Sequence, residues 1–382
     1  MLIRFFQSFR EKKKFLKTFS EWRSELSKIP NSQLKEKKLL IIRLDDIGDY
    51  LLFRNSLHLY KRSLKWQGYS IHFLGNIVWK DLFEMMDADA TDKNIWVNKS
   101  TYLADANYRQ TLWQELRAND YEIVICPSHT RPLLLDDLCM LATDASIRIA
   151  SPNTYKFKAW NKLSDSFYTS LYPSSELIHE FLFNQKFASW CTGITSTLTR
   201  PEINTHTSPA PLQNYILCFI GANFKSKQWP LEKWITFINQ VRKNYSYEVV
   251  IAGGKREEEF AKKLEEKTQV LNIVNKTDLP GITNWFANAQ VVISNDTMAS
   301  HLAASYHRPL IIIANGNNFF RFTAYKEAGM DKIITVYPKR FLNQWKKKNH
   351  TAFLNYTAVT KDITTIPVPE VLDAFNKLIN EQ

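Results

Sequence analysis

Short apolar runs alternate with stretches of helical periodicity from residue 39 onward. In the first half of the chain, the apolar runs that we expect to form strands lie at 39–44, 71–74, 95–97, 123–126 and 147–150. The helical patterns between them lie near 50–66, 79–86, 107–118 and 133–142. Strands that alternate with helices are typical of a parallel sheet covered on both faces. The pattern therefore predicts an α/β unit over residues 39–205.

The same alternation resumes after residues 195–212, which are rich in Thr, Ser and Pro and are typical of a linker. The second set of expected strands lies at 215–220, 249–251, 271–274, 291–294, 310–313 and 333–336, and a last helix is expected at 369–379. We therefore expect a second domain at 206–382. Two α/β units in tandem predict a central cleft, where ligands bind at the carboxyl ends of strands.

Residues 1–38 form a third region, with a different pattern. Their apolar residues recur at helical spacing at Phe5, Phe9, Phe15, Phe19, Trp22, Leu26 and Ile29. Eleven Lys or Arg stand against four Glu here, a net charge of +7. The pattern predicts a basic amphipathic helix, which either lies on an anionic membrane surface or packs on the protein's own body. Both alternatives stay open.

The net charge of the whole chain is +12, from 50 Lys and Arg against 38 Asp and Glu, so residues 39–382 carry only +5. An excess of this sign favours an anionic partner. Nucleic acid accounts for it poorly, because the excess is concentrated in the arm and no nucleic-acid module is visible. We expect phosphate and lipid instead.

Cysteine spacing and hydropathy indicate the compartment. Cys126, Cys139, Cys191 and Cys218 lie far apart, which is typical of buried, reduced thiols rather than a metal site. No apolar run approaches the ~20 residues of a membrane-spanning helix, and no signal-peptide pattern opens the chain. We expect a cytoplasmic protein, peripheral at the inner membrane at most.

The first strand runs directly into Arg43-Leu44-Asp45-Asp46-Ile47-Gly48-Asp49 and then a helix. Gly48 would let the backbone approach a ligand. Asp49 could act as a general base at the mouth of the cleft or simply cap the helix, and the local pattern leaves both open. The spacing of Asp45, Asp46 and Asp49 also matches an aspartate-rich magnesium motif, but that motif belongs on a helix of an all-helical fold.

Three turns of the second unit carry candidate phosphate-binding groups. They are Gly221 to Pro230, which contains Asn223 and Lys227; Gly253-Gly254; and Ser294 to Ala304, which contains Asp296, Thr297, Met298 and His301. In the last, Asp296 or Thr297 would cap a helix whose first amides could hold phosphate. A hydrolase triad is disfavoured, because no Gly-x-Ser-x-Gly is present, and no complete dinucleotide or P-loop motif is present either.

Taken in order, these segments resemble the heptosyltransferase family of bacterial lipopolysaccharide synthesis. That family consists of inverting glycosyltransferases with the GT-B fold, in which two Rossmann-like domains face a central cleft. The resemblance covers residues 39–340. It implies transfer of a sugar from a nucleotide diphosphate donor to a lipopolysaccharide or related glycan acceptor, without a metal or other cofactor.

The resemblance also implies roles for residues. Asp49 corresponds to the catalytic base of that family, and Lys227 corresponds to a lysine that contacts the diphosphate. The remaining nucleotide-sugar-binding positions would be Asn223, Gly254, Asp296, Thr297, Met298 and His301. Met298 departs from the family's usual glycine, and the acidic residue expected after the glycine turn is not assignable between Glu257 and Glu258.

We infer the acceptor-binding residues from position rather than from the resemblance. Arg54 and Asn55 lie one helical turn beyond Asp49, and His129 and Arg131 lie after the strand at 123–126. Two alternatives to a transferase stay open. One is a nucleotide-sugar epimerase on the same fold, and the other is a catalytically silent nucleotide-sugar-binding protein, for which Met298 is the main argument.

Overall fold

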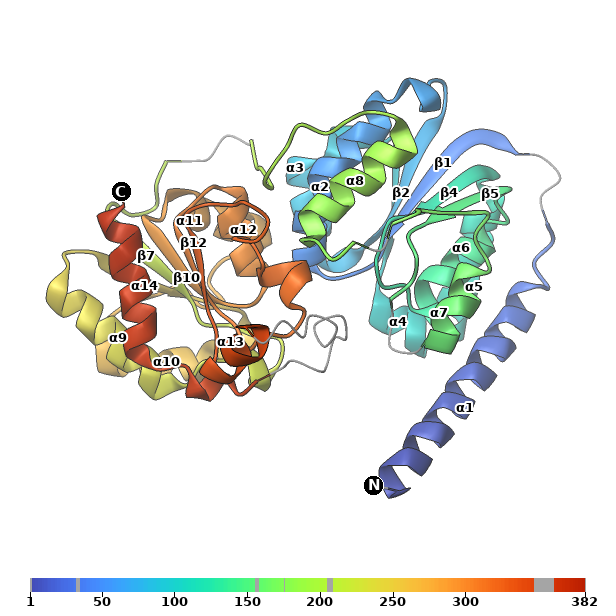
Figure 1. The fold of residues 1–382 in the computed structure, drawn as a ribbon. Helices are drawn as coiled ribbons and strands as arrows, with labels where there is room; N and C mark the ends of the chain where they lie inside the picture. Colours follow the sequence, from blue (N-terminus) through green and yellow to red (C-terminus); the bar gives the residue numbers. More distant parts are fainter. Residues whose placement is uncertain are drawn as a thin grey trace.

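Two parallel sheets, one in each half of the chain, organise the molecule (Figure 1). The computed structural model describes residues 2–31, 35–154, 158–174, 176–204, 209–346 and 361–381, and of residues 2–12 and 158 it describes the backbone alone. Within these residues each sheet has six strands, in the orders β3-β2-β1-β4-β5-β6 and β12-β11-β10-β7-β8-β9. The expected architecture of two Rossmann-like domains is confirmed.

The first sheet is built around β1. Its strands are β1 (Glu36–Arg43), β2 (Ser70–Asn76), β3 (Lys93–Val97), β4 (Tyr121–Cys126), β5 (Ile147–Ala150) and β6 (Ser170–Leu171). Residues 39–43 of β1 are all buried, as expected for a central parallel strand covered on both faces. The short β6 was not predicted.

The second sheet is built around β10. Its strands are β7 (Tyr215–Phe219), β8 (Glu248–Ala252), β9 (Leu271–Asn272), β10 (Val291–Asn295), β11 (Leu310–Ile313) and β12 (Ile333–Val336). All five residues of β10 are buried, and it pairs with β7 and β11. Its carboxyl end therefore lies at the middle of the sheet edge.

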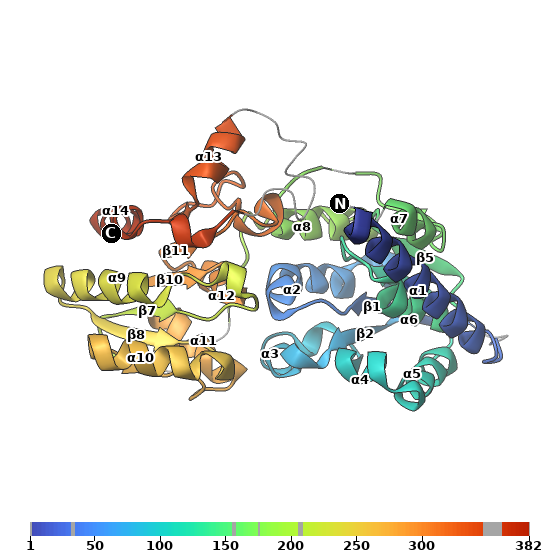
Figure 2. The same cartoon turned by 90° about the horizontal axis from the view of Figure 1, so that it is seen from below.

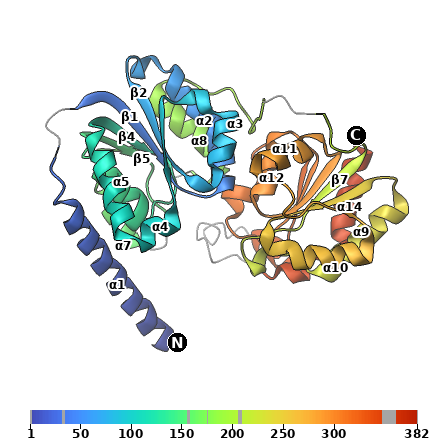
Figure 3. The ribbon, with the colours of Figure 1, turned by 180° about the vertical axis from the view of Figure 1, so that it is seen from behind.

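Helices cover both faces of each sheet (Figures 1 and 3). Those of the first half are α2 (Ile47–Arg62), α3 (Lys80–Met86), α4 (Lys99–Ala104), α5 (Ala106–Ala118), α6 (Leu138–Ala142), α7 (Lys158–Asp165) and α8 (Glu180–Thr192), with a π-helical turn η4 (Leu133–Asp137). Those of the second half are α9 (Leu231–Asn244), α10 (Glu258–Thr268), α11 (Leu279–Asn288), α12 (Met298–Ser305), α13 (Lys339–Lys346) and α14 (Val368–Asn380), with a π-helical turn η7 (Phe319–Thr323).

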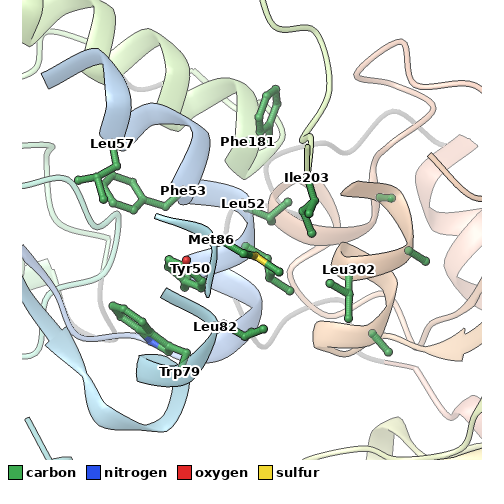
Figure 4. Close-up of a cluster of buried hydrophobic side chains, with 14 of the residues drawn as sticks. Tyr50, Leu52, Phe53, Leu57, Trp79, Leu82, Met86, Phe181, Ile203 and Leu302 are labelled. Carbon is green, nitrogen blue, oxygen red and sulfur yellow. The ribbon is translucent and has the colours of Figure 1, made fainter. Parts of the chain in front are cut away.

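The chain passes from the first sheet to the second after α8, which packs against α2. The segment that follows is held between the domains, since the Ile203 amide donates to the Ser305 carbonyl at 3.0 Å. Figure 4 shows Leu52, Met86, Ile203 and Leu302 gathered at this junction. The predicted boundary at 205/206 lies outside the described residues and stays a prediction.

The predicted N-terminal helix is α1 (Leu2–Leu26). Phe15 stacks on Trp160 with ring centroids 4.1 Å apart, Phe19 and Leu26 are buried, and the guanidinium of Arg109 lies 3.6 Å from the centroid of Trp22. The second half of α1 thus packs on the protein's own body. Figure 2 shows α1 crossing the underside of the first domain, and its first turns project beyond the body (Figures 1 and 3). No helix in the described part of the chain is long and apolar enough to cross a membrane.

Candidate active site

Asp49 lies in the first turn of α2, at the carboxyl end of the central strand β1. The helix begins at Ile47 with Asp46 as its N-cap residue, so the interpretation of Asp49 as the cap is wrong. The Asp49 side chain instead pairs with Arg321 of the second domain, at 3.4 Å between Oδ1 and Nη2. It is 17% exposed, which leaves the carboxyl largely shielded but reachable.

Asp49 ends a chain of ion pairs that crosses from one domain to the other. Arg43 Nε lies 2.8 Å from Asp45 Oδ2, and its Nη2 lies 3.2 Å from Glu180 Oε1. Arg321 Nε lies 2.8 Å from the other oxygen of Glu180. Glu180, at the start of α8, is fully buried between the two guanidinium groups. Buried charges need such partners, because an unpaired one is costly.

The two carboxyl groups that meet Arg321 have different pKa values because their surroundings differ. Burial, with the nearby Asp45, raises the pKa of Asp49 to about 7, while Arg321 and Arg43 act in the opposite direction. Burial opposes the charge of Glu180 too, but Arg321, His129 and Arg43 hold the pKa of Glu180 well below its usual range. Glu180 is therefore ionised, and Asp49 is the group that can accept a proton near neutral pH.

The magnesium interpretation of the aspartate run finds no support in the described residues. Asp45 pairs with Arg43, Asp46 with Lys99 at 2.7 Å, and Asp49 with Arg321. No group of three or more His, Cys, Asp or Glu side chains in the described ranges could hold a metal ion. The three aspartates point to three different cations rather than to one centre.

Across the junction, α12 begins at Met298 directly after β10. Thr297 is its N-cap residue, and its hydroxyl accepts from the Ala299 amide at 3.3 Å. Asp296 is buried, and its Oδ2 accepts from Lys227 Nζ at 2.6 Å. The side chain of Met298 packs against the hydrophobic junction, while its Cα lies near the backbone of Gly48.

His301 lies one turn inside α12 and is buried. Its Nδ1 lies 2.6 Å from the Tyr325 hydroxyl, and burial, with the nearby Lys227, lowers the pKa of His301 to about 3. The ring is therefore neutral at physiological pH. A Cβ placed on Gly48 would lie 2.8 Å from His301 Cδ2, so only glycine lets the two helix starts approach this closely.

Two asparagines hold the turn that carries Lys227. Asn295 donates to the carbonyls of Ile220 and Gly221 and accepts from the Trp229 amide, all within 3.2 Å. Asn315 donates to the Ser226 carbonyl at 2.9 Å. Lys227 is thereby fixed beside Asp296, whereas Asn223 on the same turn is exposed.

The glycine turn after β8 is closed by Glu257. The amide of Gly254 donates to Glu257 Oε2 at 3.0 Å, and a Cβ on Gly221 would lie 3.3 Å from the same oxygen. Glu257 is buried, whereas Glu258 is exposed and starts α10. Of the two glutamates that the sequence left open, Glu257 is the one that faces both glycine turns.

Arg54 and Asn55 both have partners within the protein. The guanidinium of Arg54 is buried and donates to both oxygens of Asp87, at 2.8 and 2.9 Å. Asn55 exchanges two hydrogen bonds with the backbone of Glu202, at 2.9 and 3.0 Å. Both residues tie α2 to the interdomain segment, and their role in binding an acceptor stays a prediction.

Arg131 and His129 differ in position. Arg131 is fully buried and pairs with Asp165 at 2.7 Å, which makes its role structural as well. His129 is half-buried and stacks on Phe183, with ring centroids 3.6 Å apart. Burial lowers the pKa of His129 to about 4, and it lies near enough to Glu180 to affect that carboxyl. Of the four acceptor candidates, His129 is the one that lies beside Glu180, in the ion-pair chain that ends at Asp49.

The structure thus brings Asp49, Lys227, Asp296, Thr297, Met298 and His301 to one junction. Sequence reasoning missed Glu180 and Arg321, which complete the ion-pair chain, and Tyr325, which supports His301. No local signal marks them, because Arg321 meets Asp49 across 272 residues of chain.

Part of the sequence is similar to a family of known proteins. Residues 182–330 match the model of glycosyltransferase family 9 (heptosyltransferase). Lipopolysaccharide heptosyltransferase 1 of Escherichia coli (strain K12) is 30% identical over 105 residues, which are 28% of this chain and 33% of that protein. The chain therefore spans about a third of the length of the curated relatives it matches.

Solved structures match over nearly the whole chain. The glycosyl transferase family 9 protein from Veillonella parvula has a TM-score of 0.69 at 17% identity, over 92% of this chain and 100% of its own. The E. coli heptosyltransferase WaaC with ADP has a TM-score of 0.65 at 16% identity, over 89% of this chain and 99% of its own. Residues 182–330 are thus similar to the glycosyltransferase family 9 (heptosyltransferase) model, in a chain that has the two-domain fold of these solved structures.

Proposed function

We propose that the protein is an inverting glycosyltransferase that moves a sugar, a heptose, from an ADP-type nucleotide diphosphate donor to a lipopolysaccharide or related glycan acceptor. The observation that carries the proposal is the position of Asp49. Its shielded carboxyl, with a pKa of about 7, follows directly after Gly48, the residue that approaches Met298 and His301 at the start of α12. The donor class is supported by the heptosyltransferase names of the relatives and by the ADP bound to one of them.

Asp49 would act as the general base on the acceptor. Its carboxylate would take the proton of an acceptor hydroxyl as that oxygen bonds to the anomeric carbon of the donor. The bond from the anomeric carbon to the phosphate oxygen breaks at the same time, and the electron pair leaves with the nucleoside diphosphate. Attack from the face opposite the leaving group inverts the configuration.

The second domain would stabilise the leaving diphosphate. Lys227 and the first amides of α12 supply fixed positive potential, which is the arrangement that stabilises developing negative charge without reorganisation. In the structure Lys227 pairs with Asp296, so an arriving phosphate would compete for the same ammonium. The neutral ring of His301, supported by Tyr325, can offer one further N–H.

A donor-binding assay with two lysine variants tests the donor side. A ligand that binds only the folded state raises the melting temperature, so nucleotide diphosphate sugars can be ranked by thermal shift. We expect Lys227→Ala to weaken binding of ADP-heptose by about 10- to 100-fold, as loss of a charged hydrogen bond implies. Lys225→Ala is the matched control, because Lys225 is exposed on the same turn.

Product analysis in the same reactions separates the alternatives. A transferase forms a glycosylated acceptor, an epimerase converts the donor without an acceptor, and a silent binding protein shows a thermal shift and no product. Equal binding in the Lys227 and Lys225 variants would contradict the proposed donor site.

We also propose that α1 makes a peripheral contact with an anionic membrane. Its second half is occupied by the protein's own body, but its first turns project away and carry Arg10 and Lys12 to Lys14 in their sequence. Basic residues near an anionic surface contribute about 1 kcal/mol each. The contact would bring the first domain to a lipid-borne acceptor.

A further inference from the structure

Arg321 is the group of the second domain that reaches the proposed base. Its Nη2 lies 3.4 Å from Asp49 Oδ1, and its Nε donates to Glu180 Oε2 at 2.8 Å. We propose that Arg321, held by Glu180, is a positioning residue that orients the Asp49 carboxylate and keeps it ionised for proton transfer. This inference rests on the proposed function, in which Asp49 is the base.

The geometry of the guanidinium favours positioning over simple charge pairing. Arg321 uses two different nitrogens for its two carboxylates, and a planar guanidinium fixes the angle between them. Glu180 is fully buried and 2.8 Å from Arg321, so it is the firm anchor. Asp49 is partly exposed and farther from Arg321, which leaves its second oxygen for a substrate hydroxyl.

The charges of the ion-pair chain explain why Asp49, the proposed base, lies at its end. When all five groups are ionised, Arg43 and Arg321 carry two positive charges against three negative ones, a net charge of −1. Glu180 is shared by both arginines, whereas Arg321 is the only cation within 4.0 Å of Asp49 among the described residues. A proton taken up by Asp49 therefore neutralises the cluster, which favours removal of the proton from an acceptor.

The groups that face Asp49 come from every element packed around it. Arg43 and Asp45 come from β1 and the turn after it, Glu180 from α8 and Arg321 from η7. His301 of α12 lies beside Gly48 and is uncharged near neutral pH. Arg321 is the cation in this set that belongs to the second domain. The base would therefore be complete only when the two domains are joined as in the structure.

Two substitutions at Arg321 separate charge from orientation. Arg321→Gln removes the charge, and Arg321→Lys keeps it but lacks the planar pair of donors. Arg340→Gln is the matched control, since Arg340 is exposed on α13 of the same domain. Each variant is compared with the parent chain by carboxyl ¹³C NMR titration, with Asp49→Asn to assign the Asp49 signal, and by the pH dependence of kcat/KM.

We expect Arg321→Gln to raise the titration midpoint of Asp49 by about 1 to 3 pH units, because an opposite charge at this distance favours the ionised form. The acid limb of kcat/KM should move by the same amount. We expect Arg321→Lys to keep the midpoint near that of the parent but to lower kcat by about 10- to 100-fold through misplacement of the carboxylate. Arg340→Gln should match the parent in both measurements.

An unchanged midpoint in Arg321→Gln would overturn the electrostatic role, and full kcat in Arg321→Lys would overturn the positioning role. If the glutamine variant does not fold, the lysine variant still decides through kcat. The titration midpoint of Asp49 is measured without substrate, so this result does not depend on whether the proposed function is correct. That function fails separately, if no nucleotide sugar yields a transfer product or if Asp49→Asn retains transfer.

Discussion

Gly48 sets how closely the base approaches the second domain. A Cβ at this position would lie 2.8 Å from His301 Cδ2, and the His301 ring is backed by the Tyr325 hydroxyl. The ring therefore has little room to retreat. Because Gly48 has a hydrogen atom where alanine has a methyl group, the starts of α2 and α12 can approach this closely.

We expect Gly48→Ala to destabilise the protein by about 1 to 3 kcal/mol, the usual cost of overpacking, and to lower transfer strongly. Thermal unfolding and initial rates measure the two effects. Because the clash is with one side chain, the cost should shrink when His301→Ala is present as well. If Gly48→Ala costs the same in both backgrounds, the His301 ring is not what excludes the methyl group.

The residues that the sequence identified share one property. Asp49, Lys227, Thr297 and His301 all follow a predicted strand, so the end of that strand already placed them at the edge of a sheet. Arg321 and Glu180 follow no such rule, because each matters only through a contact that tertiary structure makes. The cap interpretation of Asp49 failed for a local reason, since the helix starts two residues earlier than Asp49.

At the scale of elements, α1 is divided between two surroundings. Phe15, Phe19 and Leu26 pack on the first domain, and Arg117 donates to the backbone of Ile29 and Pro30 just beyond the helix. The second half of α1 therefore packs on the protein's own body. The proposed membrane contact would involve the exposed basic side chains and the first turns of α1.

Charge reversal tests that alternative. Lys13, Lys14 and Lys17 are exposed on α1, and changing all three to Glu should lower binding to phosphatidylglycerol vesicles by about 100-fold or more, at about 1 kcal/mol per basic residue. The control reverses Lys262, Lys263 and Lys267, which are exposed on α10. Equal loss in both variants, or none in either, would contradict a contact through α1.

The elements that the sequence predicted well are the buried parallel strands, since a continuous apolar run such as 39–42 has few other interpretations. The helix α8 was missed because it is buried around most of its surface, including Phe181, Asn184 and Phe187, and so shows no helical alternation. The strand β6 is only two residues long and gave no pattern.

At the scale of the molecule, the junction between the domains is part of the site. Leu52 and Met86 meet Leu302 and Ile203 there (Figure 4). Arg54 and Asn55 tie α2 to the backbone of Glu202. Repetition of the α/β pattern predicted two domains and their facing edges. It could not predict which side chains meet across them, so the contacts of Arg54 and Asn55 with the backbone of Glu202 were not predicted.

The central claim is that Asp49 removes the proton of the acceptor. The most direct test is the initial rate of sugar transfer from ADP-heptose to truncated lipopolysaccharide by the parent chain, Asp49→Asn and Asp46→Asn, measured as a function of pH. Asp46 is the control, because it is exposed and paired with Lys99, and asparagine serves equally well as an N-cap.

We expect kcat/KM of the parent and of the Asp46 variant to increase as the pH rises through about 7, because a protonated Asp49 cannot accept a proton. We expect Asp49→Asn to keep donor binding, to lose transfer by about 10²- to 10⁴-fold above pH 7, where the parent carboxyl is ionised, and to lack the rise in rate through pH 7. Transfer by Asp49→Asn at the rate of the parent would contradict the role of Asp49 as the general base.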